Sequence, residues 1–221
     1  KNPFKDARVR RALNMSVDRQ VLQRTIMRGL SIPAAIMVAP GVNGHTNELD
    51  KVAPANPEGA KKLLADAGYP NGFEFTLDCP NNRYVNDERI CQALAAMWSQ
   101  IGVATKVNTM PRAVYFPKLE KLDTSFYMLG WGGASTDGIF TLQPVLSTWN
   151  GKGDGDFNYG RYSNAKVDEL TAKVKVNMNQ QERLAQIREA LLAQNAQVNL
   201  IPLHRQVIPW ASRSNVSVPH R

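Results

Sequence analysis

Residues 73–79 read Phe73-Glu74-Phe75-Thr76-Leu77-Asp78-Cys79, so apolar side chains occupy every second position. This alternation predicts a β-strand with one apolar face. A helix is expected next, over residues 87–100 with Gly102 as its stop, followed by a strand over residues 103–110. Two strands joined by one helix form a βαβ unit, whose strands run parallel with a right-handed crossover.

The chain after this unit repeats the pattern. A helix over residues 112–122 leads into the apolar segment 126–129, which predicts another strand. Two helices are expected over residues 164–176 and 180–197, and then a strand over residues 200–210 whose prolines suit an edge position. The predicted fold class is therefore α/β, with βαβ units and a mainly parallel sheet flanked by helices.

The first 29 residues predict two capped helices in succession. Asp6 is a candidate cap for the first helix and Asp18 for the second. Thr25 belongs to the expected inward face of the second helix, and Gly29 supplies its left-handed stop.

Residues 30–56 are rich in Pro, Gly and Asn and have no sustained periodicity. They are expected to form a long surface loop. The next helix begins at Asn56-Pro57-Glu58, which combines a cap, a proline in the first turn and an acid.

The composition is that of a globular chain with a basic surface. At 221 residues and 43% hydrophobic content, residues 1–221 are expected to form a single domain. The formal net charge of +8 favours an anionic partner: nucleic acid, an anionic membrane surface or an acidic ligand. No apolar run is long enough for a membrane-spanning helix. The arginines from Arg8 to Arg28 lie largely outside the apolar stripe, which is typical of a solvated helix face.

Cys79 and Cys91 are the two cysteines of the chain. Cys79 lies on the apolar face of its strand and Cys91 on the apolar face of the following helix, so both point at the same interface. Two buried free thiols and a disulfide are both compatible with this placement.

A glycine-rich turn follows the segment 126–129 and is the first candidate site. It contains Trp131, Gly132, Gly133, Ala134 and Asp137. Ligands of open α/β sheets bind beyond the carboxyl ends of strands. Glycines allow close approach of the backbone, and a Trp ring offers a flat apolar wall. The alternative is a structural turn with a half-buried Trp.

The turn after the strand 73–79 is the second candidate. It holds Asn82, Arg83 and Tyr84, and it is expected at the same edge of the sheet as the glycine-rich turn. Arg83 is suited to a carboxylate or phosphate, and Tyr84 to stacking. An ordinary solvated loop is the alternative.

Catalytic and metal-binding motifs are absent from the sequence. His45, His204 and His220 fall in a loop, a strand and the tail, without the spacing of a metal site or a catalytic motif. Residues 150–159 alternate acids with Asn and Gly, but they lack the Gly and Glu positions of an EF-hand. Neither an enzyme, a metal site nor a cofactor is predicted.

Five features occur together in a familiar order: the opening helices, the helix at Asn56-Pro57, the βαβ unit with Ile101-Gly102-Val103, the Gly130-Trp131 turn and the segment Ile201-Pro202-Leu203. In this order the chain resembles the second lobe of extracytoplasmic solute-binding proteins of the dipeptide, oligopeptide and nickel class, which feed ABC importers.

This resemblance implies a periplasmic-binding-protein-like lobe whose first lobe lies outside the chain. It further implies a periplasmic or extracytoplasmic location, a small-molecule or peptide-like ligand, and an ABC permease as partner. Hinge closure over the ligand is the implied mechanism, and nucleic acid is not an implied partner.

The resemblance also assigns residues. In that family an acid three positions after the Trp grips a peptide's amino group, but here that position is Ala134, and Asp137 matches a second acid of the pattern. The resemblance therefore predicts that the ligand lacks a free amine there, or that another carboxylate supplies the charge. The stretch 82–84 falls roughly opposite further ligand-contacting residues of the family.

Two other classes of function stay open on the sequence. The basic charge favours a domain that binds nucleic acid or another anionic polymer, although aromatic residues are not interleaved with the arginines. An α/β enzyme is the third candidate, and a His or Cys with a strongly shifted pKa in a pocket would indicate it.

Overall fold

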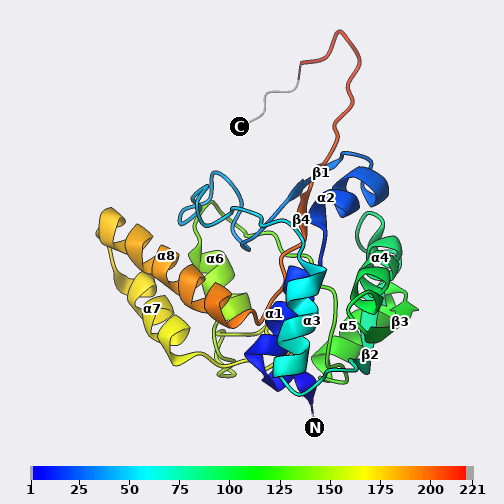
Figure 1. Ribbon diagram of the computed structural model, residues 1–221. Helices are drawn as coiled ribbons and strands as arrows, with labels where there is room; N and C mark the ends of the chain where they lie inside the picture. The colour runs from blue at the N-terminus through cyan, green and yellow to red at the C-terminus, as the bar shows by residue number, and fades with distance from the viewer. Residues whose placement is uncertain (1, 218–221) are drawn as a thin grey trace.

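The computed structural model describes residues 2–217 (Figure 1). The pair α7 (Ala165–Val176) and α8 (Gln180–Gln197) lies on one side of the molecule. The unit of β2 (Phe73–Pro80), α4 (Asp87–Ser99), β3 (Val103–Met110) and α5 (Arg112–Glu120) lies on the other. Between them stand α1 (Ala7–Met15) and α3 (Pro57–Asp66). No helix within residues 2–217 is both long and apolar enough to span a bilayer.

The shorter elements complete the order. These are α2 (Arg19–Val21), continued by a π-helical turn over Leu22–Ile26, β1 (Ser31–Pro33), α6 (Ile139–Thr141), continued by a second π-helical turn, and β4 (His204–Gln206). β1 and β4 pair antiparallel, and the described chain after β4 extends away from the body (Figure 1).

The predicted βαβ unit is confirmed. β2 and β3 pair in parallel over their full lengths, from Phe73 opposite Val103 to Pro80 opposite Met110, with α4 as the crossover. The Phe75 ring lies 5.1 Å from Phe126 and 5.6 Å from Trp98 of α4, so an aromatic cluster fills the space between strand and helix.

The predicted third strand over residues 126–129 is shorter than expected. It makes one parallel bridge, in which Asp78 donates its amide to Phe126 O at 2.9 Å and accepts from Met128 N at 3.1 Å. The next donor of a parallel ladder is the amide of residue 80, and Pro80 has no N–H. The Tyr115 hydroxyl donates to Met128 O instead, so the chain leaves the sheet at this point.

The predicted helix caps are confirmed. Asp6 accepts from Arg8 N at 2.8 Å, Asp18 accepts from Val21 N at 2.9 Å, and Gly29 has a φ of +82°. The inward position assigned to Thr25 is wrong: the residue is exposed, and its hydroxyl donates to Val21 O. The π-helical turn widens the helix by one residue and moves the buried face to Met27.

The expectation of a featureless surface loop over residues 30–56 is wrong in part. The segment contains β1, and Ile36 and Val38 are 2% exposed in the core. Asp50 holds it in place, because its Oδ1 accepts from Ala35 N at 2.9 Å while its Oδ2 pairs with Arg205 at 2.6 Å.

The arginines of α1 are not simply a solvated face. Arg10 donates to Gln197 O at 2.7 Å, Arg11 to Ala196 O at 2.9 Å, and Arg8 to Asp66 O at 2.7 Å. The last carbonyls of a helix lack donors within that helix. These side chains therefore complete the ends of α8 and α3 and connect them to α1.

Cys79 and Cys91 form a disulfide between β2 and α4, with Cα atoms 6.7 Å apart. Both residues are fully buried in the cluster formed by α1, α3, α4 and β2. Of the two alternatives that the sequence left open, the structure has the bridge.

Reducing this disulfide is expected to lower the free energy of unfolding by about 3 kcal/mol, because the bridge restricts a loop of this length in the unfolded chain. Urea unfolding with and without dithiothreitol measures the difference. The double variant Cys79→Ala, Cys91→Ala is the control and should not respond to the reductant. Equal midpoints for the oxidised and reduced protein would contradict the assignment.

Candidate functional site

The two turns singled out in the sequence lie against each other. The Tyr84 hydroxyl donates to Gly130 O at 3.4 Å, and a Cβ atom on Gly130 would lie only 2.5 Å from the Tyr84 ring. A glycine is therefore required at 130 for this contact. Residues 81–86 and 130–137 meet at this contact, and the two turns together are called the rim below. A meeting of this kind is expected where turns follow neighbouring parallel strands.

Asp87 at the start of α4 builds the first turn. Its Oδ2 accepts from Arg83 N at 2.9 Å and from Tyr84 N at 3.0 Å. Asn82 Oδ1 accepts from Arg112 N at 2.7 Å, so the turn is also fixed to α5. The Arg83 guanidinium lies 4.8 Å from the centroid of the Tyr84 ring, which is cation–π geometry.

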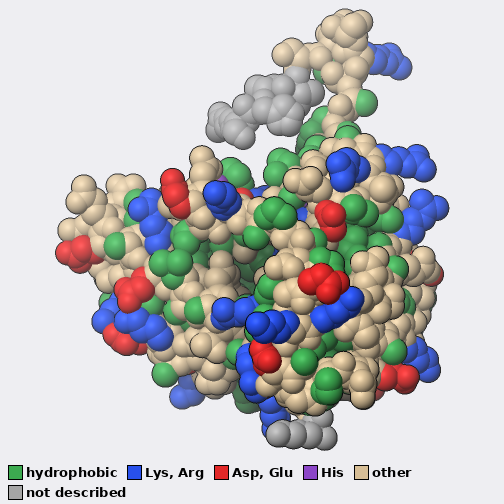
Figure 2. Space-filling model, in the orientation of Figure 1, with side chains coloured by type: hydrophobic (Ala, Val, Ile, Leu, Met, Phe, Trp, Pro, Cys, Tyr) green, Lys and Arg blue, Asp and Glu red, His purple; other side chains and the backbone are tan. Residues whose placement is uncertain are grey.

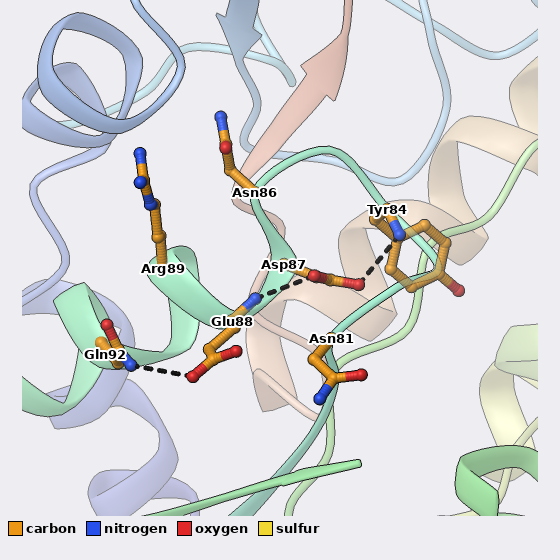
Figure 3. A pocket seen from close by; sticks show the side chains of 7 residues that line it. All are labelled: Asn81, Tyr84, Asn86, Asp87, Glu88, Arg89 and Gln92. Atoms are coloured by element: carbon orange, nitrogen blue, oxygen red, sulfur yellow. Dashed lines mark hydrogen bonds between the residues drawn. The ribbon is translucent and has the colours of Figure 1, made fainter. Parts of the chain in front are cut away.

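A hollow of about 450 Å³ adjoins this turn (Figure 3). Its lining consists of Asn81, Tyr84, Asn86, Asp87, Glu88, Arg89 and Gln92. Figure 3 shows the Tyr84 ring pointing away from the side chains that α4 contributes. Of the residues predicted individually as ligand contacts, Tyr84 lines this hollow, and Asn81 belongs to the same predicted turn. Sequence reasoning did not predict the α4 residues of the lining. The pattern that could have indicated them is a helix that begins directly after the turn at the end of a strand.

The glycine-rich turn presents aromatic side chains. Trp131 Nε1 donates to Phe140 O at 3.0 Å, and its ring packs 4.9 Å from the Phe157 ring at an interplanar angle of 56°. Phe140 and Phe157 are 42% and 39% exposed. Trp131 and Phe157 are called the aromatic wall below. Sequence reasoning found Trp131 and missed Phe157, which comes from a later loop.

The remaining predicted residues divide into two groups. Gly132, Gly133 and Ala134 are exposed, and no carboxylate comes from position 134. Asp137 is half-buried and forms an ion pair with Arg183 of α8, with Oδ1 2.9 Å from Nη2. Its Oδ1 also accepts from Ile139 N at 2.9 Å. The Asp137 carboxylate thus fastens the glycine-rich turn to α8.

The pKa of Asp137 reflects this pairing. Burial is the largest single influence and would raise the pKa. The hydrogen bonds from Arg183, the Ile139 amide and Asn43, together with the charge of Arg183, outweigh it, so the pKa lies below the ordinary value for an Asp.

The histidines do not belong to the rim. His45 Nε2 lies 3.2 Å from Asp50 Oδ2, His204 belongs to β4, and His220 lies outside the described residues. Burial lowers the pKa of His204. Residues 2–217 contain no group of three His, Cys, Asp or Glu side chains placed to hold a metal ion.

Asp137→Asn is expected to destabilise the protein at pH 7 and to lose this effect in acid. A carboxyl whose pKa is lowered by folding stabilises above its unfolded pKa of about 3.9, and the contribution is lost as the pH falls through the folded value. Urea unfolding at pH 7 and at about pH 2.5 measures the difference from the unmodified protein.

Glu169→Gln is the control for this prediction, because Glu169 pairs with Lys173 on an exposed helix face. It should change the free energy of unfolding by less than about 1 kcal/mol at either pH. An Asp137→Asn effect of equal size at both pH values would contradict a role for the ion pair.

Comparison with known families gives a match over the first 153 residues. Residues 1–153 match the model of the bacterial extracellular solute-binding proteins, family 5 middle. The match includes α1 to α6, β1 to β3 and both turns of the rim.

Individual relatives agree with this match. The chain is 30% identical over 210 residues to heme-binding protein A of Haemophilus influenzae, covering 94% of this chain and 38% of that protein. It is 29% identical to the glutathione-binding protein GsiB of Salmonella typhimurium, covering 85% of this chain and 37% of that protein. The chain thus spans about two fifths of the length of these curated relatives.

A solved structure supports the fold. The dipeptide-binding protein of Pseudoalteromonas sp. SM9913, in complex with Met-Leu, superposes with a TM-score of 0.84 at 21% identity, covering 93% of this chain and 41% of that one. The chain belongs to the bacterial extracellular solute-binding proteins of family 5.

Proposed function

We propose that this chain is the ligand-binding lobe of a solute-binding protein that serves an ABC importer. The contact of the two turns along one rim carries the proposal, because the rim gathers Tyr84, Arg83 and the aromatic wall on one side of the molecule. Membership of the solute-binding family supports it.

The proposed mechanism is hinge closure. A ligand on the rim meets Asn82, Arg83 and Tyr84 from one turn and the segment 131–137 from the other. A second lobe covers it, and the closed state, in which both lobes contact the ligand, is delivered to a membrane permease. The periplasm is the proposed location, and the Cys79–Cys91 disulfide is compatible with an oxidising compartment.

The rim also narrows the proposed ligand class. Trp131 and Phe157 offer ring faces, and the Arg83 guanidinium attracts an anionic group. Ala134 supplies no carboxylate for an ammonium, and the carboxylate of Asp137 is neutralised by Arg183. We therefore propose a solute with a flat or apolar body and an anionic group, without a primary ammonium bound at this turn. Relatives carry names that refer to heme and glutathione.

Binding of an anionic polymer is not proposed. The net charge of +8 favours it, but Arg8, Arg10 and Arg11 donate to internal acceptors. These guanidinium groups are therefore partly occupied by hydrogen bonds within the protein and are less available to an anionic polymer.

Calorimetric titration of the 221-residue chain with heme, glutathione and Met-Leu tests the proposal. Because one lobe offers half of the contacts, we expect weak but saturable binding of heme, which has a flat body, two carboxylates and no ammonium, with a Kd above about 10 μM. Trp131→Ala should weaken that binding about tenfold or more through loss of the ring contact.

Met178→Ala is the matched control, because Met178 is 94% exposed between α7 and α8 and should leave the Kd unchanged. A Kd that Trp131→Ala does not change would place the ligand away from the rim. Preferential binding of Met-Leu would contradict the proposed ligand class.

A further inference from the structure

Arg19 is a buried cation without an acidic partner. It is 7% exposed. Its Nε donates to Pro202 O at 2.7 Å and to Ala34 O at 3.1 Å, and its Nη2 donates to Asn14 Oδ1. All of these acceptors are neutral, and burial lowers its pKa to about 10.

Two other arginines of the fold are compensated. Arg183 pairs with Asp137 and Arg205 pairs with Asp50, each within 3 Å. A buried charge without an opposite charge costs several kcal/mol in general. Arg19 also retains donor capacity: Nη2 carries two hydrogens, and Asn14 Oδ1 is its one acceptor among residues 2–217.

A cavity of about 370 Å³ lies beside Arg19 and is rich in donors. Lys51, Asn14, Asn56 and Asn195 are among the residues that line it. The oxygens of Asn14 and Asn56 accept from Arg19 and from Gly59 N, which leaves both NH₂ groups available. No Asp or Glu of the described chain lines the cavity.

The acids that neighbour these cations in sequence are committed elsewhere. Asp50, next to Lys51, binds Arg205, His45 and the Ala35 amide. Asp18, next to Arg19, caps α2 through two amide hydrogen bonds. The charge of the cavity lining is therefore positive.

The rest of the lining is apolar, with Met15, Leu49, Val198 and Leu200 among its residues. The surface is hollowed between α8 and the pair α1 and α3 (Figure 2). This cavity shares no residue with the hollow of Figure 3 or with the rim.

We propose that this cavity binds a small organic anion, with a carboxylate or phosphate group against Arg19 and Lys51 and an apolar body against the walls formed by Met15, Leu49 and Leu200. Charge-assisted hydrogen bonds from the guanidinium and the amides would hold the anionic group. The inference is independent of the proposed function, since it uses a different part of the surface.

Titration of the 221-residue chain with hexanoate and with hexyl phosphate tests the site, with 1-hexanol as the uncharged match and constant ionic strength throughout. Calorimetry should show saturable binding of at least one anion and none of hexanol. Saturation by one anion alone identifies the group that the site prefers.

Two variants locate the binding. Asn195→Asp places a carboxylate in the cavity at a side chain that makes no hydrogen bond of its own in the described structure, and it should weaken anion binding at least tenfold. Lys51→Ala should weaken it in the same direction, and it stays informative if Asn195→Asp does not fold. Asn71→Asp and Lys62→Ala are the controls, because both residues are exposed and lie outside the cavity.

The inference is overturned if neither anion saturates, if hexanol binds as well as the anions, or if the cavity variants bind like their controls. An Asn195→Asp protein with a higher unfolding temperature in the absence of anion would support it further, because the new carboxylate compensates Arg19.

Discussion

The parallel pairing of β2 with β3 is the constraint on which the rim depends. Because both strands run in the same direction, the turn after β2 and the start of α5 emerge at one edge, where Asn82 accepts the amide of Arg112. The bridge between Asp78 and Tyr127 brings a third chain segment to that edge. A slip of one residue in this pairing would exchange the two faces of β2 and remove its apolar side chains from the core.

The end of the sheet at Pro80 then produces the aromatic wall. Because Pro80 has no backbone N–H, the hydrogen-bonded ladder ends at Met128. The carbonyl oxygen of Met128 accepts a hydrogen bond from the Tyr115 hydroxyl instead. The released chain becomes a turn, which allows Trp131 to reach Phe157. Its far end is fixed to α8 by Asp137 and Arg183. The turn that carries Trp131 is therefore held at both ends by polar contacts.

Sequence reasoning succeeded where the signal is local and failed where it is not. The caps at Asp6, Asp18 and Asn56 and the period of β2 are properties of a few neighbouring residues, and the structure has them as predicted. The pairing of β1 with β4 joins residues 31–33 to 204–206. The strand predicted over residues 200–210 contains β4, but residues 31–33 show no strand pattern by themselves, so the partner strand was missed. Phe157 joins the candidate site in the same non-local way, through packing on Trp131.

The basic charge of the chain illustrates the same limit in energetic terms. In sequence, Arg10, Arg19 and Arg183 are equivalent cations, but one completes the end of a helix, one is caged by neutral acceptors and one neutralises an Asp. Their contributions to the stability of the fold differ, because the free energy of burying a charge depends on the groups that surround it. Net charge therefore predicts the charge of a binding partner only when the side chains that already pair within the fold are left out of the sum. Arg19 stays in that sum, because its acceptors within the described residues are neutral.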